Sequence, residues 1–376
     1  MKINNVKIKN FKSLRDINIQ LNNLTLITGV NSSGKSSFIQ ALLFLKENED
    51  NLALFGRFNS LKKPLTINGK YIELGNKKDI LYEEAYEENI QIALFSQDSL
   101  IIDVQFNNQD LKIDSQTNVP FVLDGEVYVI CNIFAHDFQY IMTDRAIPSI
   151  TYGLSDESLG QNLIGFKGEF SAHYLAENRH KALNIEALRH QDSQTKQLLE
   201  NVSLWLGEIS RGIEISATVY NELQQVNLTY SYVYGDKQTD KYTPLNVGFG
   251  ITYVLPIIVA ILKAKPNDLL IIENPESHLH PAGQSKIAEL CAIASANGVQ
   301  IIVETHSDHF LNGIRVATKK GLLTPEQSSI YYFRKEKDEL ETKIDEININ
   351  KDGGIDNYPK GFFDQFDDDL DELLGL

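Results

Sequence analysis

The most informative stretch of the sequence is Gly29-Val30-Asn31-Ser32-Ser33-Gly34-Lys35-Ser36, which has the Walker A spacing of glycine, any four residues, glycine, lysine and serine. An apolar run at residues 24–28 precedes it and predicts a short buried strand, and residues 37–45 follow it and predict a helix. A strand, a loop and a helix in this order are the context in which the motif binds phosphate groups. The alternative, a plain glycine turn before an ordinary helix, is therefore disfavoured.

The residue types of this loop suit a phosphate ligand. Gly29 and Gly34 allow the backbone to turn so that successive N–H groups face one concavity, and the following helix directs its positive end to the same place. Lys35 supplies a positive charge for β- and γ-phosphates, and the Ser36 hydroxyl is a ligand for Mg²⁺. The residues from which we expect nucleotide contacts are Gly29, Asn31, Ser32, Ser33, Gly34, Lys35, Ser36 and Ser37.

Composition indicates a soluble globular protein. Of the 376 residues, 42% are hydrophobic and 23% are charged, which allows a large core. We find no apolar run long enough to span a bilayer, and no signal-peptide pattern precedes the first expected strand. Cys131 and Cys291 lie in apolar surroundings without paired spacing, which favours free thiols in a reducing compartment. The expected location is the cytoplasm, without a membrane partner.

The net charge of −16 argues against a nucleic-acid interface over the whole surface. Local basic strips remain open, because electrostatic fields act over a Debye length of about 10 Å. The candidates are the lysine pairs at residues 62–63, 77–78 and 319–320. A solvated face is the favoured explanation for each pair.

The pattern along the chain predicts β segments around the Walker A loop and in the first third of the sequence. The expected β runs are residues 3–8, 17–21, 24–28, 90–95, 100–106 and 125–131. The helix after the loop is expected to extend to about residue 47, and the polar residues 48–80 are expected to form a surface loop.

The second half of the pattern is more helical. Residues 174–209 predict a helix, either as one projecting arm about 50 Å long or with a bend near residues 191–193. Residues 213–219 and 226–234 predict a β-hairpin with one exposed face. An amphipathic helix near the end is expected to dock on the body through Phe362, Phe363, Phe366, Leu370 and Leu373.

A second part of the phosphate site is predicted at residues 268–273, an apolar strand that ends in Glu273. A carboxylate at this place orders Mg²⁺ opposite Ser36, as in a Walker B element. A buried strand that ends in glutamate is common, so this signal is weak without its surroundings.

The following residues strengthen the assignment. Another apolar strand is predicted at residues 300–304, ending in Glu304 and leading to His306. Residues 284–294, which lie between the two strands, predict a helix, so the segment is a βαβ unit with a right-handed crossover. We therefore expect Glu273, Glu304 and His306 at the same edge of the sheet as the phosphate loop.

These segments together resemble the ABC-type ATPases of the overcoming-lysogenization-defect (OLD) and RecF-like group, within the broad AAA family. The segments that carry the resemblance are Ile8–Leu14, the Walker A loop, Asn246–Gly250, Glu273–Pro281, Glu304–Ser307 and Gly361–Gln365. The resemblance implies that ATP and Mg²⁺ are the cofactors. It also implies a head-to-tail homodimer with two ATP molecules enclosed between the subunits.

The resemblance implies further residue roles. Residues 245–249 are similar to the signature loop, in which Asn246 and Gly248 would close over the γ-phosphate held by a second subunit. Residues 277–280 are similar to the D-loop, and His306 is similar to the switch histidine that senses the γ-phosphate.

One position departs from the family pattern. The place after Glu273, where a carboxylate often polarises the attacking water, holds Asn274, which cannot accept a proton. General-base assistance is typically worth about 10²–10⁴-fold in rate. We therefore expect slow hydrolysis, with Glu276 or Glu304 as alternative bases. No glutamine loop is assigned within residues 80–110.

A metal cluster is an alternative interpretation of the residues near the second strand. The side chains concerned are His278, His280, Glu304, His306, Asp308 and His309. Imidazole and carboxylate ligands suit Zn²⁺ or Mn²⁺. Their spacing matches no closed zinc pattern, however, and the ATPase interpretation explains the same residues, so a dedicated metallohydrolase is disfavoured.

Arg145 is a further candidate, because it follows the apolar residues 138–142. An arginine there either reaches a phosphate or pairs with a carboxylate in the core. We favour the pairing with a carboxylate.

The predicted fold is an α/β ABC-type P-loop ATPase head with a mixed sheet and flanking helices. Residues 1–150 and 240–345 are expected to form the head, residues 151–239 a helical and β-hairpin insertion, and residues 346–376 a C-terminal docking element.

The expected function is a slow, nucleotide-gated dimeric switch that regulates a separate effector such as a nuclease, in phage defence. The defence role follows from analogy with the family alone. Because few residues follow position 345, we expect any cutting activity to belong to a separate polypeptide. The alternatives are a RecF-like DNA-repair ATPase that binds DNA, and a self-sufficient enzyme, either a metal-dependent nuclease or a small-molecule phosphotransferase.

Overall fold

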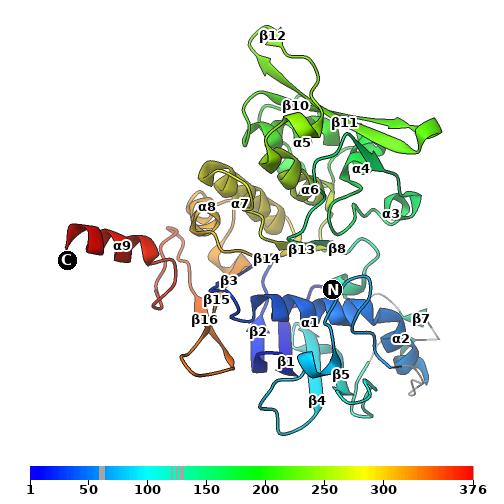
Figure 1. Cartoon of the computed structure of the whole chain (residues 1–376), viewed down its shortest axis with the longest axis vertical. Coiled ribbons are helices and arrows are strands. Elements are labelled where there is room, and N and C mark those ends of the chain that lie inside the picture. Colours follow the sequence, from blue (N-terminus) through cyan, green and yellow to red (C-terminus); the bar gives the residue numbers. More distant parts are fainter. Residues whose placement is uncertain (59–63, 120–121, 124–125, 128–130, 376) are drawn as a thin grey trace.

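The computed structural model describes residues 1–58, 64–119, 122–123, 126–127 and 131–375. A six-stranded sheet runs through the middle of the molecule (Figure 1). Its strands are, in spatial order, β16 (Thr342–Ile347), β15 (Ser328–Lys335), β3 (Leu24–Gly29), β14 (Gln300–Glu304), β13 (Leu269–Glu273) and β8 (Gln139–Ile141). Every neighbouring pair is parallel except β15 with β16. Strand ends from distant parts of the chain therefore meet at one edge of the sheet.

Both faces of this sheet are buried. One face packs against helix α1 (Lys35–Glu47) and a second, antiparallel sheet. The strands of that second sheet are, in order, β2 (Leu14–Gln20), β1 (Asn5–Phe11), β4 (Asn89–Ser96) and β5 (Ser99–Asn107). The helices on the other face are α6 (Phe249–Lys263), α7 (Pro281–Ala296) and α8 (Asp308–Lys319). Burial on both faces explains why the central strands are apolar without alternation.

The helices beside the sheet edge begin at residues that suit a helix start. His280 caps α7, because its Nδ1 accepts the N–H of Ala282 at 3.4 Å, and proline occupies the first helical position. Ser307 caps α8 by accepting the N–H of Phe310 at 3.0 Å. Helix α6 is buried on all sides from residue 251 to residue 263, as expected of its predominantly apolar sequence.

The structure confirms the β runs predicted in the first third of the chain, with shifted ends. Strands β1, β2 and β3 cover the first three, and β4 and β5 cover the runs at 90–95 and 100–106. The run predicted at 125–131 contains β7 (Glu126–Val127), which pairs with β6 (Val122–Leu123). Residues 125 and 128–130 of that run lie outside the described residues.

The surface loop predicted for residues 48–80 is wrong in part, because helix α2 (Glu49–Phe58) forms within it. Leu52 and Phe55 are buried there. The asparagine-rich composition suggested a loop, but the buried Asn48 side chain binds the backbone of Thr66. Its side chain accepts the N–H of Thr66 at 2.8 Å and donates to the Thr66 carbonyl oxygen at 2.9 Å.

The insertion forms a separate layer beyond α6 and α7 in Figure 1. Its elements are β9 (Thr151–Gly153), α3 (Asp156–Gly160), α4 (Ser171–Asn178), α5 (Leu198–Gly207), β10 (Ile213–Tyr220), β11 (Gln225–Tyr234) and β12 (Lys237–Gln238). All of β10 pairs with residues 225–232 of β11, which confirms the predicted hairpin. The remaining short elements are 3₁₀ turns at Lys77–Asp79, Asn132–Phe134, Glu186–Leu188, Asn221–Leu223, Pro244–Asn246 and Pro325–Gln327.

The single long helix predicted over residues 174–209 is wrong. The chain leaves the helical conformation after α4 and regains it only at α5. Between them, Leu183 and Leu198 donate their backbone N–H groups to Lys196 and Lys181 at 2.9 Å, so the chain folds back on itself. The turn at residues 191–192 lies where the alternative prediction placed a bend. The leucine spacing resembled that of one long helix because leucines on both sides of the turn are buried in the same hydrophobic core.

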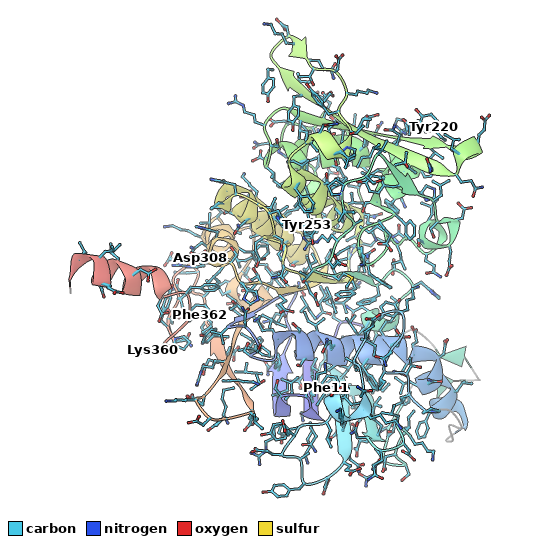
Figure 2. The ribbon with its side chains drawn as sticks, in the orientation of Figure 1. Phe11, Tyr220, Tyr253, Asp308, Lys360 and Phe362 are labelled. Carbon is cyan, nitrogen blue, oxygen red and sulfur yellow. The ribbon has the colours of Figure 1, made fainter. Side chains whose placement is uncertain are left out.

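Helix α9 (Gln365–Leu374) forms where an amphipathic helix was predicted. The predicted docking is wrong for Leu370 and Leu373, which are 41% and 83% exposed, and the side chain of Phe366 lies outside the described part. Figure 1 shows α9 pointing away from the rest of the chain. The buried anchor is Phe362, labelled in Figure 2, whose ring packs edge-on against Tyr332 at 5.4 Å. No helix within the described ranges is both long and apolar enough to cross a membrane.

Gly29 provides a test of how closely the phosphate loop packs against β15. Its φ is +143°, and a Cβ added there would lie 2.0 Å from the backbone oxygen of Phe333. We expect Gly29→Ala to lower the free energy of unfolding by about 3 kcal/mol, because a backbone atom cannot move aside as a side chain can.

The matched control is Gly321→Ala, where φ is +71° and nothing lies within 4 Å of the added Cβ. Backbone strain alone should cost about 1 kcal/mol at this position. Urea unfolding of both variants measures the difference. Equal losses would contradict the steric explanation for Gly29.

Candidate functional site

The phosphate loop joins β3 to α1 and has the shape expected of it. Gly29 and Gly34 have positive φ values of 143° and 103°, and Ser32 also has a positive φ of 61°. The buried Lys35 side chain folds back over the loop, where its Nζ donates to the carbonyl oxygens of Gly29 and Val30 at 3.0 and 2.8 Å. In this position the ammonium group faces the concavity that a phosphate would occupy.

Two residues from outside the loop hold it in place, and the sequence analysis gave neither of them a role. The Thr342 hydroxyl in β16 donates to the carbonyl oxygen of Ser33 at 2.8 Å and lies 2.8 Å from the Ser13 hydroxyl. A Cβ at Gly34 would lie 2.3 Å from the Thr342 hydroxyl oxygen and 2.8 Å from that of Ser13. Glycine is therefore required at position 34 for space as well as for its positive φ.

Ser36, the predicted magnesium ligand in the loop, meets Glu304. Its hydroxyl lies 3.1 and 3.3 Å from the two carboxylate oxygens of Glu304 at the end of β14. Glu304 is 4% exposed. Burial raises the pKa of Glu304 to about 7, and the neighbouring carboxylate of Glu273 acts in the same direction, while Lys35 opposes them.

Glu273, the second predicted magnesium ligand, stands beside Glu304, because the two residues are register partners in β13 and β14. Its carboxylate accepts the hydroxyl of Tyr140 at 2.9 Å, and the backbone N–H and hydroxyl of Thr143 at 3.2 and 3.0 Å. Tyr140 and Thr143 come from β8 and the loop after it. Neither residue was predicted from the sequence, because a hydroxyl that binds a distant carboxylate leaves no periodicity in its own segment.

Glu276 and His306 are also brought together. One oxygen of Glu276 accepts the hydroxyl of Thr305 at 2.7 Å, and the other accepts the backbone N–H of His306 at 2.8 Å. The turn after β13 is thereby fastened to the segment after β14. Burial, and then the charge of Lys35, lower the pKa of His306.

Among the described residues, no carboxylate forms an ion pair with Arg145, so the favoured pairing is wrong. Its Nη2 donates to the backbone carbonyl oxygens of Glu273 and Asn274, the latter at 3.0 Å. The arginine therefore stabilises the backbone of the turn after β13 through these two hydrogen bonds. Backbone acceptors carry no sequence signature, which is why the pattern suggested a carboxylate.

The histidines of the alternative metal cluster have other contacts. His278 packs edge-on against the rings of Phe249 and Tyr253 at 4.7 and 5.0 Å, and His280 caps α7. Within the described ranges, no group of three or more His, Cys, Asp or Glu side chains is arranged to hold a metal ion.

The predicted signature residues, Asn246 and Gly248, lie immediately before α6. Gly248 is the N-cap residue of α6, and the Asn246 side chain donates to the Thr243 hydroxyl at 3.0 Å. Leu245 and Phe249 beside them are 56% and 41% exposed. An exposed helix start flanked by apolar side chains suits contact with another molecule.

In two of the three lysine pairs considered as basic strips, one lysine has a contact within the protein. Lys77 donates to the carbonyl oxygen of Gln109 at 2.7 Å, and Lys320 pairs with Glu289 at 3.3 Å. Lys62 and Lys63 lie outside the described residues.

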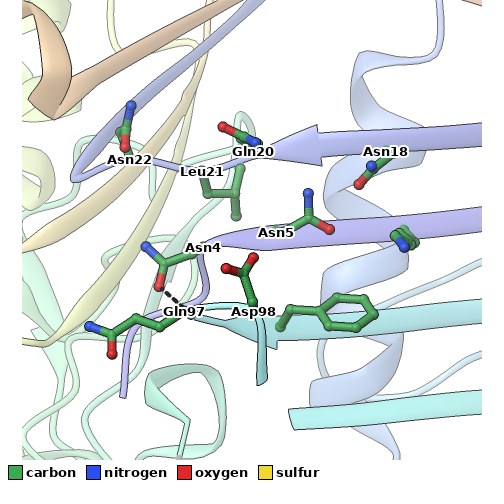
Figure 3. Close-up of a pocket in the computed structure, with 10 residues that line it drawn as sticks. Asn4, Asn5, Asn18, Gln20, Leu21, Asn22, Gln97 and Asp98 are labelled. Carbon is green, nitrogen blue, oxygen red and sulfur yellow. Dashed lines mark hydrogen bonds between the residues drawn. The ribbon is translucent and has the colours of Figure 1, made fainter. Parts of the chain in front are cut away.

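A cavity of about 520 Å³ lies away from the phosphate loop and is shown in Figure 3. Its lining is rich in amides and comprises Asn4, Asn5, Lys7, Asn18, Gln20, Leu21, Asn22, Phe95, Gln97 and Asp98. Asn22 precedes the start of β3, whereas the phosphate loop follows its end. The strand separates the two by about 20 Å at 3.3 Å per residue, so this cavity is not part of the phosphate site.

The residues at the sheet edge fit a nucleotide with Mg²⁺. The Ser33 hydroxyl is buried and has no hydrogen-bond partner among the described residues, as expected of a group that awaits a ligand. Ser36, Glu273 and Glu304 offer the oxygen ligands that Mg²⁺ prefers. Lys35 supplies the positive charge for the phosphates.

Comparison with known proteins gives three family matches. A family described as "AAA ATPase domain" matches residues 1–204. A family described as "AAA domain, putative AbiEii toxin, Type IV TA system" matches residues 140–312, and a family of unknown function, DUF3696, matches residues 323–373.

Among curated relatives, the OLD nuclease of Thermus scotoductus is 24% identical over 330 residues, which cover 81% of this chain and 59% of that protein. The Old nuclease of Escherichia phage P2 is 23% identical over 353 residues, covering 84% of this chain and 58% of that protein. The chain thus spans less than two thirds of the length of these two relatives.

Among solved structures, an SMC head bound to the C-terminal winged-helix domain of ScpA aligns with a TM-score of 0.56 at 13% identity, covering 93% of this chain and 98% of that one. The Smc head with an extended coiled coil, bound to the C-terminal domain of ScpA derived from Pyrococcus furiosus, has a TM-score of 0.51 at 12% identity and 99% coverage of both chains. These likenesses confirm the predicted ABC-type P-loop ATPase head. The chain therefore belongs to the AAA ATPase domain family, as an OLD-like member with the fold of an SMC-type head.

Proposed function

We propose that the chain binds ATP with Mg²⁺ at the phosphate loop, hydrolyses it slowly, and uses it to control the pairing of two copies. In the pair, the loop of each copy would face Asn246 and Gly248 of the other. Residues 1–150 and 240–345 would form the nucleotide-binding head, residues 151–239 the insertion, and residues 346–376 a C-terminal element anchored by Phe362.

The observation that supports this proposal best is the convergence of distant residues on the phosphate loop. Ser36 contacts Glu304 at 3.1 Å, and Glu273 stands in register with Glu304. Glu273 and Glu304 are separated from the loop by more than 230 positions of sequence, so their proximity to it is a property of the fold. Slow hydrolysis is supported by Asn274, which occupies the place where a general base is expected.

Each residue would have a defined part in hydrolysis. Backbone N–H groups of the loop and Lys35 would bind and orient the phosphates, and Ser36 and Glu273 would hold Mg²⁺, which neutralises the charge that develops on them. Glu304 lies where its carboxylate can order water beside Ser36. His306, held through its backbone by Glu276, would face the terminal phosphate.

The paired state would regulate a separate effector protein, such as a nuclease, in phage defence in the cytoplasm. This part of the proposal draws on the named relatives, which are nucleases. DNA is a further candidate partner, as in a RecF-like DNA-repair ATPase, and a metal-dependent nuclease activity of the chain itself is the alternative enzyme.

Purified wild-type chain with plasmid DNA tests these options. We expect sedimentation velocity to show pairing with ATP and Mg²⁺ but not with ADP, and we expect intact plasmid. Plasmid cleavage that survives Lys35→Ala would contradict the switch and favour the nuclease. DNA binding that appears only with ATP would favour the RecF-like alternative.

His306→Ala separates sensing from binding. We expect the Kd for ATP to stay within about twofold, because the loop and Lys35 are untouched, and we expect kcat to fall about ten- to a hundredfold, the value of one hydrogen bond to a charged group. Titration calorimetry and phosphate-release assays measure the two quantities.

His309→Ala is the matched control for that variant. His309 lies in the first turn of α8 with its side chain about half exposed, 3.7 Å from Asp308. We expect it to behave as wild type. A weaker Kd in His306→Ala with unchanged kcat would argue against the sensing role.

A further inference from the structure

Arg145 is a buried cation next to the proposed nucleotide site, at the turn after β13. It is 1% exposed, and backbone oxygens rather than a carboxylate accept its hydrogen bonds. Its Nε and Nη1 are buried without a hydrogen-bond partner among the described residues. Burial lowers its pKa to about 10. A buried, incompletely paired cation is costly, so its position calls for a function.

Tyr253 links this arginine to α6, on which Figure 2 labels it. The guanidinium carbon of Arg145 lies 4.8 Å from the centre of the Tyr253 ring, within the range of a cation–π contact. The Tyr253 hydroxyl accepts the backbone N–H of Arg145 at 3.2 Å and donates to the carbonyl oxygen of Thr143. One side chain of α6 therefore holds residues 143–145 at both ends.

Residues 143–145 in turn hold the turn after β13. Thr143 contacts the Glu273 carboxylate, and its hydroxyl also lies 2.8 Å from the side-chain oxygen of Asn274. Arg145 binds the backbone carbonyl oxygens of the same two residues. Both the side chains and the backbone of Glu273 and Asn274 are thus positioned from this segment.

A second contact joins α6 to the same turn further along. Phe249 and Tyr253 pack against the His278 ring, and a Cβ at Gly250 would lie 2.3 Å from the His278 carbonyl oxygen. The first turns of α6 are therefore in direct contact with the turn. A shift of the helix start must move Asn274 and His278 or break these contacts.

We propose that Tyr253 and Arg145 are positioning residues that couple the start of α6 to Glu273 and Asn274. This inference rests on the proposed function, in which the start of α6 contacts the nucleotide held by a second copy. Nucleotide at one site of the pair then sets the geometry of hydrolysis at the other site. Tyr253 carries the coupling because its hydroxyl bonds the backbone of both Thr143 and Arg145 from α6.

Mixed pairs test this coupling. Differently tagged subunits yield a pair of one intact subunit and one Lys35→Ala subunit, which leaves a single filled site. The hydrolysis rate per intact site is compared with that of the pair in which both sites are filled. We expect filling the second site to raise the rate about tenfold, a usual size for coupling between sites. When all subunits carry Tyr253→Phe, which removes only the hydroxyl, we expect that ratio to fall to about one.

A matched control addresses a merely structural role. Lys263 is a buried cation in α6 itself, 5.8 Å from the Tyr174 ring centre, and it donates to the Asn162 carbonyl oxygen at 2.7 Å. Lys263→Met removes a comparable contact at the far end of the helix. We expect it to retain the tenfold ratio, whatever its stability.

The outcomes are distinct. A ratio of about ten that persists in Tyr253→Phe, or a ratio of one in the wild type, overturns the coupling and leaves the proposed switch intact. A ratio that falls equally in Lys263→Met also overturns it, because the effect is then not specific to Tyr253. If the wild type forms no ATP-dependent pair, the proposed function fails and the coupling fails with it.

Discussion

Replacing Lys35 with alanine is expected to abolish ATP binding at micromolar concentrations. Two opposite charges about 4 Å apart attract by about 4 kcal/mol at an effective dielectric constant of 20, which corresponds to about a thousandfold in Kd. The phosphates lose that attraction when Lys35 is removed. The Gly29 and Val30 carbonyl oxygens also lose their donor, so the loop itself loosens. Titration calorimetry with ATP and Mg²⁺ measures the affinity.

Lys46→Met is the matched control, because Lys46 is another buried lysine, in the last turn of α1. Its Nζ contacts Glu49 at 2.7 Å, far from the phosphate loop. We expect its Kd for ATP to equal that of the wild type. If Lys35→Ala bound ATP within threefold of the wild type, the loop would not be the phosphate site.

The part of the site that the sequence predicted depends on short-range patterns. The spacing from Gly29 to Ser36 dictates the loop, and the apolar runs before Glu273 and Glu304 dictate parallel strands. Parallel strands joined by a right-handed crossover must end at one edge of the sheet. The proximity of these residues can therefore be predicted without knowing how the side chains pack. The register of Glu273 with Glu304 confirms that reasoning.

The part that the sequence did not predict consists of supporting contacts from distant segments. Thr342 meets the loop across 309 positions of sequence, and Thr143 meets Glu273 across 130. A threonine hydroxyl that binds a carbonyl or a carboxylate leaves no periodicity in its own segment. The pairing of Arg145 with a carboxylate was wrongly predicted for a related reason. Its acceptors are backbone oxygens, which every residue carries.

Asn274 shows how local backbone and chemistry combine at one position. Its φ is +43°, in the left-handed region that asparagine tolerates better than most residues. Its N–H donates to the Glu304 carbonyl oxygen at 2.8 Å, which fixes it next to the two carboxylates. Asparagine therefore suits this backbone conformation, but its amide cannot act as a base.

Asn274→Glu is expected to raise kcat for ATP hydrolysis at least tenfold, because a general base typically contributes about 10²–10⁴-fold. The new carboxylate would lie beside Glu273, and repulsion between the two would raise its pKa toward neutrality, where a base works best. The left-handed backbone should cost about 1 kcal/mol of stability. Phosphate release under saturating ATP measures the rate.

Asn274→Gln is the control that isolates the base, because it has the length of glutamate and the same backbone strain without a proton acceptor. We expect its kcat to stay at or below that of the wild type. A rise in both variants would mean that side-chain length, by displacing Thr143 from its 2.8 Å contact, is what limits hydrolysis. No rise in either would assign the proton to Glu304, whose carboxylate already faces Ser36 at 3.1 Å and whose raised pKa suits that role.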